Sequence, residues 1–189
     1  MDSEAIRTFL SVDAINAHLE YLQYLKNKYS ILEKSIDDLR GKSIRQILRS
    51  GLPRDIKSEA LIKIAAVKSH ELYFSSFVPL PGPCTGLREH YSSESAFLYE
   101  LSEIGMQSEA GFMIITRSRN GKPQIHVSDG INPYLGKDSP LLAIDLYEHA
   151  YFSDYGFDKR AYLQGALSHL DLSKIFSEGN SQIYLDTKV

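Results

Sequence analysis

An aspartate and a histidine four residues apart, Asp145 and His149, form the pair most suggestive of chemistry in this 189-residue sequence. Asp145 directly follows an apolar run at residues 141–144, which predicts a buried strand. A carboxylate at the end of a buried strand is costly to desolvate unless a cation receives it. Imidazole and carboxylate are ordinary ligands of iron, manganese and zinc, so the pair indicates a metal site. The alternative is that Asp145 caps a helix and His149 packs in the core.

Two further histidines, His18 and His70, lie on the apolar faces of predicted helices. Apolar residues recur at helical spacing from residue 11 to about residue 39, and Ser11 is a good N-cap. After a break at residues 51–53, a second helix is predicted from about residue 58 to residue 77. Either histidine, taken alone, fits a packed core residue as well as a ligand.

The segment that begins at Asp145 reads D-L-Y-E-H-A-Y-F-S-D-Y, and R-A-Y-L follows at residues 160–163. It closely resembles the C-terminal signature of the iron/manganese superoxide dismutase family, D-x-W-E-H-A-Y-Y, which supplies an aspartate and a histidine ligand. Here Tyr147 stands in place of the tryptophan and Phe152 in place of the second tyrosine. Both departures lie around the metal in the family and therefore bear on activity.

The two helical histidines extend this resemblance. S-V-D-A-I-N-A-H, ending at His18, resembles the family's S-x-E-x-I-x-x-H, and V-K-S-H-E-L-Y-F around His70 resembles V-W-N-H-x-x-Y-W. A rival register aligns residues 13–18 with an earlier D-A-L-x-P-H segment, which would move the ligand position to Asn27 and lose it. The first register is preferred because it continues without a gap into G-K-S-I at residues 41–44. The resemblance thus implies four metal ligands: His18, His70, Asp145 and His149.

Around these ligands the sequence departs from the family. Leu22 and Lys26 occupy the positions of a gateway histidine and tyrosine, and Ala66 occupies that of a glutamine which orients bound solvent in iron-type members. Gln107 resembles the corresponding glutamine of manganese-type members, with one extra residue before the aromatic, or it is an ordinary loop glutamine. Lys26 is a candidate for attracting an anionic substrate.

The resemblance also implies a homodimer. Glu148 is expected at the interface, where it reaches the partner's metal histidine, the position of His149, and fixes the imidazole tautomer. The alternative is a surface glutamate. Leu22 and Phe152 are expected to pack together across the interface, replacing a polar histidine–tyrosine pair by an apolar one.

The predicted fold class is α+β, with a proline-rich linker at residues 78–83 as the domain boundary. Residues 1–79 are predicted to form a long helical hairpin. Residues 80–189 are predicted to form a smaller domain, with a helix at 94–104, strands at 112–116 and 124–127, the strand before Asp145, and a closing helical region at 155–176. An Asn-Gly pair at residues 120–121 predicts a hairpin turn. The result is a three-stranded antiparallel sheet in an Fe/Mn superoxide dismutase-like order.

Composition excludes several classes of function. The net charge of −3 gives no basic surface for nucleic acid or anionic membranes. The single cysteine, Cys84, precludes an intramolecular disulfide and fits a reducing compartment. The sequence shows neither an apolar run of membrane-spanning length nor a signal-peptide pattern, so a cytoplasmic protein is predicted.

Three neutral histidines and one aspartate give a divalent ion a single anionic ligand, which leaves room for a trivalent state. Such a site suits a one-electron cycle on a small anion, and zinc, although it fits the donors, cannot cycle. The predicted function is an iron- or manganese-dependent superoxide dismutase, with one metal per subunit and activity lowered by altered proton delivery. Two alternatives are a same-fold metalloenzyme doing other oxygen chemistry on a larger substrate and a non-enzymatic structural relative.

Overall fold

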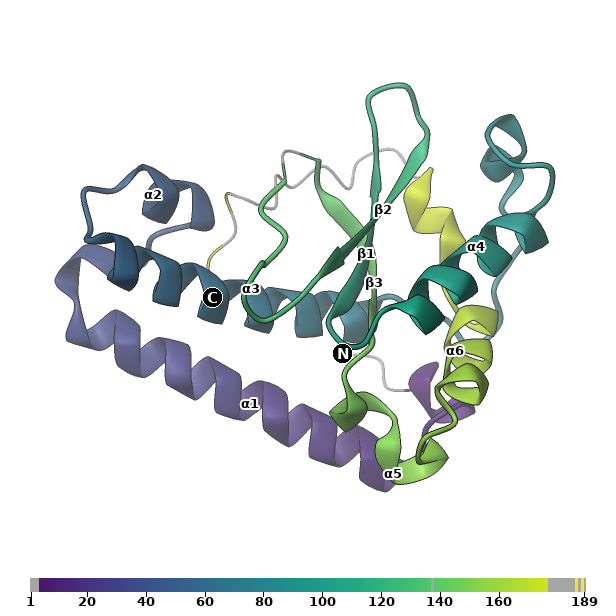
Figure 1. The fold of residues 1–189 in the computed structure, drawn as a ribbon, viewed down its shortest axis with the longest axis horizontal. Helices are drawn as coiled ribbons and strands as arrows, with labels where there is room; N and C mark the ends of the chain where they lie inside the picture. The colour runs from purple at the N-terminus through teal and green to yellow at the C-terminus, as the bar shows by residue number, and fades with distance from the viewer. Residues whose placement is uncertain (1–3, 137, 177–185, 187, 189) are drawn as a thin grey trace.

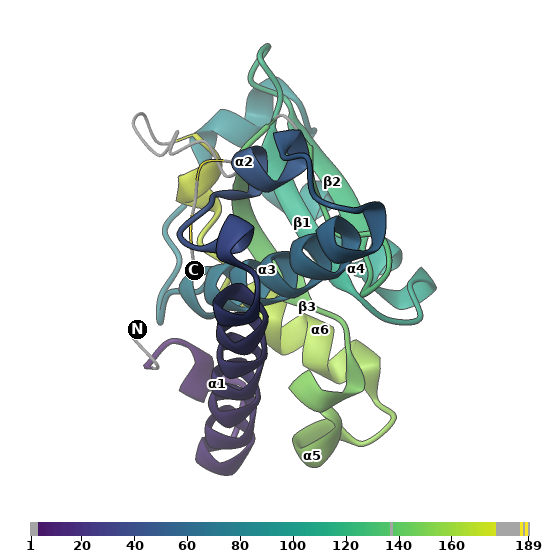
Figure 2. The ribbon, with the colours of Figure 1, turned by 90° about the vertical axis from the view of Figure 1, so that its left-hand side faces the viewer.

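Two long helices and a small sheet form the framework of this protein in a computed structural model, which describes residues 4–136, 138–176, 186 and 188. Helix α1 (Val12–Ser35) and helix α3 (Arg54–Ser75) lie side by side as a hairpin, with the short helix α2 (Ile44–Arg49) near its tip (Figure 1). Helix α4 (Glu94–Gln107), helix α5 (Phe152–Tyr155) and helix α6 (Lys159–Ser168) follow the hairpin in the chain. The view turned by 90° shows α1 at the lower left and α5 and α6 at the lower right, with α3 above them (Figure 2).

The sheet has strand order β2-β1-β3, and both pairings are antiparallel. Its strands are β1 (Phe112–Arg117), β2 (Pro123–Ser128) and β3 (Pro140–Asp145). The predicted turn joins β1 and β2, and Gly121 there has φ +86°, a conformation that favours glycine. In the register of the sheet, Phe112 pairs with Ser128 on one side and with Asp145 on the other. The three-stranded antiparallel sheet is confirmed.

Local sequence explains where the hairpin helices begin. The Ser11 hydroxyl accepts a hydrogen bond from the Ala14 backbone N–H, and its own N–H and hydroxyl donate to Asp154 of α5 at 2.7 and 2.6 Å. Helix α3 begins directly after Pro53, four residues earlier than predicted, because proline's fixed φ is compatible with a helix start.

The other boundaries differ in detail from the prediction. Helix α1 ends at Ser35 because Ile36 is extended, and a 3₁₀ helix, η2 (Asp37–Leu39), follows. The predicted closing helical region at 155–176 consists of α6 and a separate 3₁₀ helix, η5 (Leu172–Ile175). The remaining 3₁₀ helices are η1 (Ile6–Thr8), η3 (Thr85–Glu89) and η4 (Glu148–Ala150).

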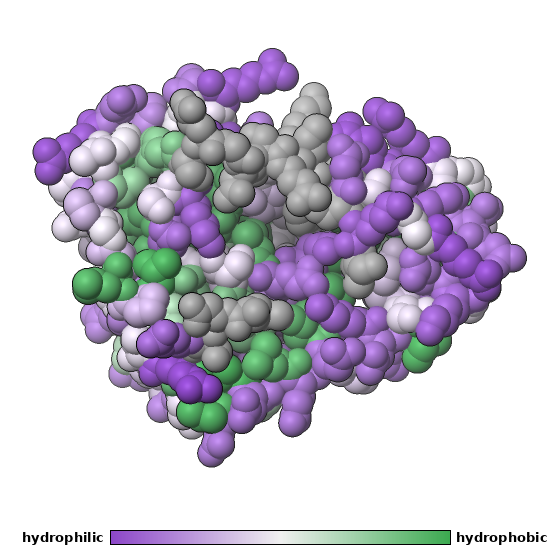
Figure 3. All heavy atoms as spheres, turned by 180° about the vertical axis from the view of Figure 1, so that it is seen from behind, coloured by the Kyte–Doolittle hydropathy of each residue, from purple (hydrophilic) through white to green (hydrophobic). Residues whose placement is uncertain are grey.

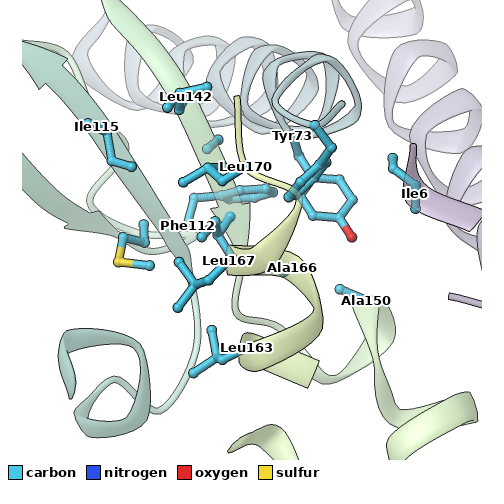
Figure 4. Close-up of a cluster of buried hydrophobic side chains, with 14 of the residues drawn as sticks. Ile6, Tyr73, Phe112, Ile115, Leu142, Ala150, Leu163, Ala166, Leu167 and Leu170 are labelled. Atoms are coloured by element: carbon cyan, nitrogen blue, oxygen red, sulfur yellow. The ribbon is translucent and has the colours of Figure 1, made fainter. Parts of the chain in front are cut away.

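One large hydrophobic core joins the two halves of the chain. Figure 4 shows Tyr73 of α3 close to residues of the sheet and of α6, such as Phe112 and Leu167. Ser76 reinforces this junction, because its hydroxyl accepts a 2.8 Å hydrogen bond from the backbone N–H of Ala143 in β3. A smaller cluster at the tip of the hairpin contains Tyr29, Leu39, Ile44, Ile47, Ala60, Leu61 and Ile64. The division at residues 79 and 80 stays a prediction.

The surface is mixed in character. Seen from behind, hydrophobic side chains gather mainly over the half that holds α4 and α6, and the half that holds α2 is mostly hydrophilic (Figure 3). Among the described residues, no helix is both long enough and apolar enough to cross a bilayer.

Candidate metal centre

Four separate elements deliver the predicted ligands to one place. His18 lies in the second turn of α1, and His70 lies in the second half of α3. Asp145 is the last residue of β3, and His149 follows in η4. One donor atom from each of the four side chains lies within 4.8 Å of all the others. The contact between the hairpin helices and the end of β3 therefore brings together residues distant in sequence.

The Asp145 carboxylate is the centre of this cluster. Its Oδ2 lies 3.2 Å from His18 Nε2, 3.6 Å from His70 Nε2 and 3.1 Å from His149 Nε2. Donors bound at about 2.1 Å to one ion lie about 3.0 Å apart at right angles and about 3.4 Å apart at tetrahedral angles. The observed separations therefore fit four donors of one ion.

The burial of His18 bears on whether the cluster fits a cation. It is 2% exposed, and neither of its ring nitrogens makes a hydrogen bond to another described residue. Burying an imidazole without hydrogen-bond partners is costly. An ion between His18 Nε2 and the Asp145 carboxylate would satisfy that nitrogen, so the residues present fit a metal.

The protonation states also suit metal binding. Burial lowers the pKa of His70 to about 4, although the negative charge of Asp145 works in the opposite direction. His70 is therefore a neutral donor at neutral pH. Burial alone would raise the pKa of Asp145, but its contacts with His149 and His18 hold that pKa well below its usual range. The cluster combines a neutral imidazole and an ionised carboxylate, as a divalent or trivalent ion requires.

Second contacts fix the orientation of two donors. The backbone N–H of Tyr147 donates a 2.9 Å hydrogen bond to Asp145 Oδ1, which leaves Oδ2 to face the histidines. His70 Nδ1 lies 2.7 Å from the Ala66 carbonyl oxygen, one helical turn earlier. This contact favours the tautomer with Nδ1 protonated and leaves Nε2 as the donor atom.

A cavity of about 310 Å³ opens beside the cluster at His70 and His149. Side chains of α1, α3 and the sheet line it, together with the loop after β2: Tyr21, Leu25, Ile62, Lys63, Ala65, Ala66, Ser69, Phe112, Ser128, Asp129, Gly130, Pro133 and Tyr147. The register of the sheet explains part of this wall, since Phe112 and Ser128 are paired next to Asp145. Ala66, which stands where iron-type members of the family carry a solvent-orienting glutamine, is one of the lining residues.

The other predicted residues around the ligands lie elsewhere. Gln107 is exposed at the end of α4 and does not line the cavity, so the geometry gives it no role in orienting bound solvent. Lys26 Nζ forms a 2.8 Å ion pair with Glu71 Oε1 and is also outside the lining. The carboxylate of Glu71 is shared with Lys68, at 2.9 Å. These three side chains together carry one net positive charge, and Lys26 is held by its ion pair away from the cavity lining.

The expected Leu22–Phe152 contact across an interface is wrong for Leu22. Leu22 is 3% exposed within the single chain and belongs to its large core, so its side chain has no free surface for a partner. Phe152 is 46% exposed, as an interface residue would be in an isolated chain. Glu148 is also exposed, next to His149.

Sequence reasoning missed Tyr21. Its ring centroid lies 4.6 Å from that of His149 and 5.5 Å from that of His70, and the side chain lines the cavity. The family frame directed attention to positions four and eight residues after His18. The available signal was helical spacing, because a residue three positions after a ligand lies on the same side of the helix.

Comparison with known proteins agrees with this geometry. Residues 84–178, half of the chain, match the family described as iron/manganese superoxide dismutases, C-terminal domain. The chain is 23% identical over 178 residues to a chloroplastic iron superoxide dismutase of Arabidopsis thaliana. This match covers 88% of this chain and 67% of the relative. It is 29% identical over 117 residues to a chloroplastic iron superoxide dismutase of rice, covering 56% of this chain and 45% of the relative.

A bacterial relative matches at similar length. The chain is 23% identical over 171 residues to an iron superoxide dismutase of Escherichia coli K12, and the match covers 85% of both chains. Identity is low, but the Arabidopsis and Escherichia coli matches extend over 88% and 85% of the chain, and the family match at residues 84–178 contains Asp145 and His149. With its helical hairpin, its three-stranded antiparallel sheet and its His-His-Asp-His cluster, this chain belongs to the iron/manganese superoxide dismutase family.

Proposed function

We propose that this chain binds one iron or manganese ion through His18, His70, Asp145 and His149 and disproportionates superoxide to dioxygen and hydrogen peroxide. The observation that carries the proposal is the convergence of three histidine Nε2 atoms within 3.6 Å of one buried carboxylate oxygen. A single ion would satisfy each donor, and it would give His18 Nε2 a partner, since neither ring nitrogen of His18 makes a hydrogen bond to another described residue.

A bound iron or manganese ion supplies the one-electron cycle, in which one superoxide is oxidised and a second is reduced. The protein provides one negative charge at Asp145 and neutral imidazoles, so both the divalent and the trivalent ion are tolerated. Full burial of Asp145 strengthens its interaction with the ion, because surrounding water cannot screen it. Exposure of His149, whose side chain is 33% accessible, leaves one side open to a small anion.

Proton supply falls to the residues of the cavity. The gateway histidine and tyrosine positions hold Leu22, which is buried, and Lys26, which is ion-paired. Tyr21 is the hydroxyl-bearing side chain of α1 that lines the cavity, and it is 38% exposed to solvent. Burial and the negative charge of Asp145 raise its pKa, so the phenol is protonated at neutral pH and can donate. Tyr21 thus supplies protons in place of the family's gateway histidine and tyrosine.

A homodimer is part of the same proposal. His149 is the most accessible of the four donors, and Glu148 beside it is exposed. A partner's carboxylate at this place would cover the imidazole and fix its tautomer. Sedimentation of the purified protein tests this: a monomer that keeps its full metal content would contradict it.

The function is tested by loading the purified protein separately with iron and with manganese, measuring metal content, and following superoxide decay directly. We expect one ion per chain and activity below that of the Escherichia coli relative, because the gate is altered. Stoichiometric metal without any acceleration of superoxide decay would overturn the proposed activity while leaving the metal site standing.

A further inference from the structure

The cavity beside the cluster is far larger than superoxide requires. A water molecule occupies about 30 Å³, and a diatomic anion needs about one or two such volumes. The cavity measures about 310 Å³, at the lower end of the range for pockets that hold organic ligands. Ala66 contributes to this space, because its side chain is one methyl group at the wall of α3.

The wall next to the cluster is built from flat rings. Tyr21, Phe112 and Tyr147 surround the two imidazoles that border the cavity, with Phe112 4.9 Å from the buried His70 and Tyr147 5.4 Å from His149 between ring centroids. Tyr147 and His149 are stacked, with 16° between their planes. Aliphatic side chains of Leu25, Ile62 and Pro133 complete the lining. This wall suits a planar aromatic ring, which gains from stacking and edge contacts as well as from apolar burial.

The charged residues among the described lining give the wall no net charge that would favour an ionic organic ligand. Its one lysine, Lys63, lies 3.4 Å from Glu59, and its one exposed carboxylate, Asp129, accepts backbone N–H bonds from Ile131 and Asn132. Among the lining residues these two opposite charges balance. The end occupied by His70 and His149 favours a polar group, because a bound ion there would accept an oxygen donor. Ser69 and Ser128 add hydroxyl groups elsewhere in the lining.

We infer that this cavity binds a small planar phenol, with its ring between Tyr21, Phe112 and Tyr147 and its hydroxyl directed at the open side of the His70–His149 pair. The position of the hydroxyl rests on the proposed metal, whereas binding of the ring rests on the cavity alone. A phenol is uncharged in neutral solution, which matches a wall whose charges balance, and its one oxygen can face the proposed ion while its ring contacts the aromatic side chains.

The test uses phenol itself as the probe, with cyclohexanol and benzoate as comparisons of similar size. Binding is measured by titration calorimetry and by ligand-observed NMR on the purified protein, both iron-loaded and metal-free. We expect saturable phenol binding to both forms, tighter in the iron-loaded one, and weaker binding of cyclohexanol, which cannot stack, and of benzoate, which carries a charge. Ala66→Phe fills the cavity and should weaken phenol binding by about tenfold or more.

The matched control is Ile31→Phe, since Ile31 is 67% exposed on α1 and away from the lining. It should leave phenol affinity unchanged. If Ala66→Phe does not fold, Ala66→Leu makes the same test with a smaller side chain. No saturable binding, undiminished binding after the cavity is filled, or tighter binding of benzoate would overturn the inference. Phenol binding without any metal uptake would overturn the proposed function and leave the cavity site standing. Dismutase activity without phenol binding would overturn the cavity site and leave the proposed function standing.

Discussion

The four donor residues match the family pattern, whereas the residues around them depart from it. The donors come from α1, α3, β3 and η4, and all of them converge as the family frame requires. The surroundings differ from the family at three positions: Leu22 is in the core, Lys26 is paired with Glu71 outside the lining, and Ala66 borders an open cavity. Because a metal site needs every donor at a fixed distance, it tolerates no gradual change, whereas a wall can be rebuilt one side chain at a time. The contrast separates what holds an ion from what selects a substrate.

The comparison is tested most severely at Asp145. Asp145→Asn removes the one anionic donor while keeping the shape of the side chain and the hydrogen bond from Tyr147. We expect metal affinity to fall by more than about 100-fold, beyond the 10–100-fold cost typical of residues that only support a ligand. Competition with a chelator measures it. Asp129→Asn is the control, as its carboxylate is exposed at the edge of the same cavity, and it should retain the metal. Equal losses in the two variants would show that general charge, rather than the cluster, attracts the ion.

Acidification should destabilise the metal-free protein through His70. Its pKa is about 4 in the folded chain and about 6.5 when unfolded, so the unfolded state binds a proton first as pH falls. The stability of the fold is therefore greatest above pH 6.5 and declines by about 3 kcal/mol as pH falls to 4. Asp145, whose pKa is lowered, adds its loss only below about pH 4, near its unfolded value.

Urea unfolding of the metal-free protein at several pH values measures this effect. His70→Gln cannot take up a proton, so its stability should vary much less over the same range. His90→Gln, distant from the cluster, should behave as the parent protein. A parent protein with constant stability from pH 7 to pH 4 would show that His70 is protonated in the folded state.

Much of the fold and all four members of the cluster could be predicted from the sequence. Asp145 at the end of an apolar run and two histidines on apolar helix faces are local patterns that leave a core role open, and the resemblance of the segments around them to a family is what assigns them as ligands. The sheet was predictable for the same reason, since the Asn-Gly turn and the apolar runs fix strands and register. The ends of helices were harder to predict. Helix α1 stops at Ser35 because the next residue, Ile36, takes an extended conformation that periodicity does not reveal.

The wall of the cavity could not be predicted because it depends on how the helices are rotated against the sheet. Counting from His18 placed Leu22 and Lys26 at the gate, but α1 buries Leu22 and presents Tyr21 to His149 instead. Gln107 was chosen for its residue type near a family motif, yet α4 ends with that side chain in solvent. Which of several neighbouring positions faces a site is a tertiary property, and spacing alone leaves it open.

Reintroducing the family's gateway histidine sharpens this point. Leu22→His would place a polar ring in a position that is 3% exposed, within the hydrophobic core. We expect a loss of about 2 kcal/mol in the free energy of unfolding, from lost apolar burial and an imidazole without partners, and no gain in dismutase rate. Leu48→His, at a 37% exposed position, should cost much less in the same denaturant titration. A faster enzyme after Leu22→His would mean that this position does face the substrate path.

The subtlest test of the altered wall is Tyr21→Phe, which removes one hydroxyl and keeps the ring beside His149. If Tyr21 donates protons, superoxide decay at saturating substrate should slow by roughly three- to tenfold, less than a sole proton donor would cost, because water in the cavity also supplies protons. Metal content should not change, since no donor is touched. Tyr24→Phe provides the control: Tyr24 stacks on Tyr21 with ring centroids 6.1 Å apart, yet it does not line the cavity, and its variant should keep the parent rate. A solvent isotope effect that is altered in Tyr21→Phe but not in Tyr24→Phe would assign the proton step to this hydroxyl, whereas equal rates in all three proteins would leave proton delivery to water alone.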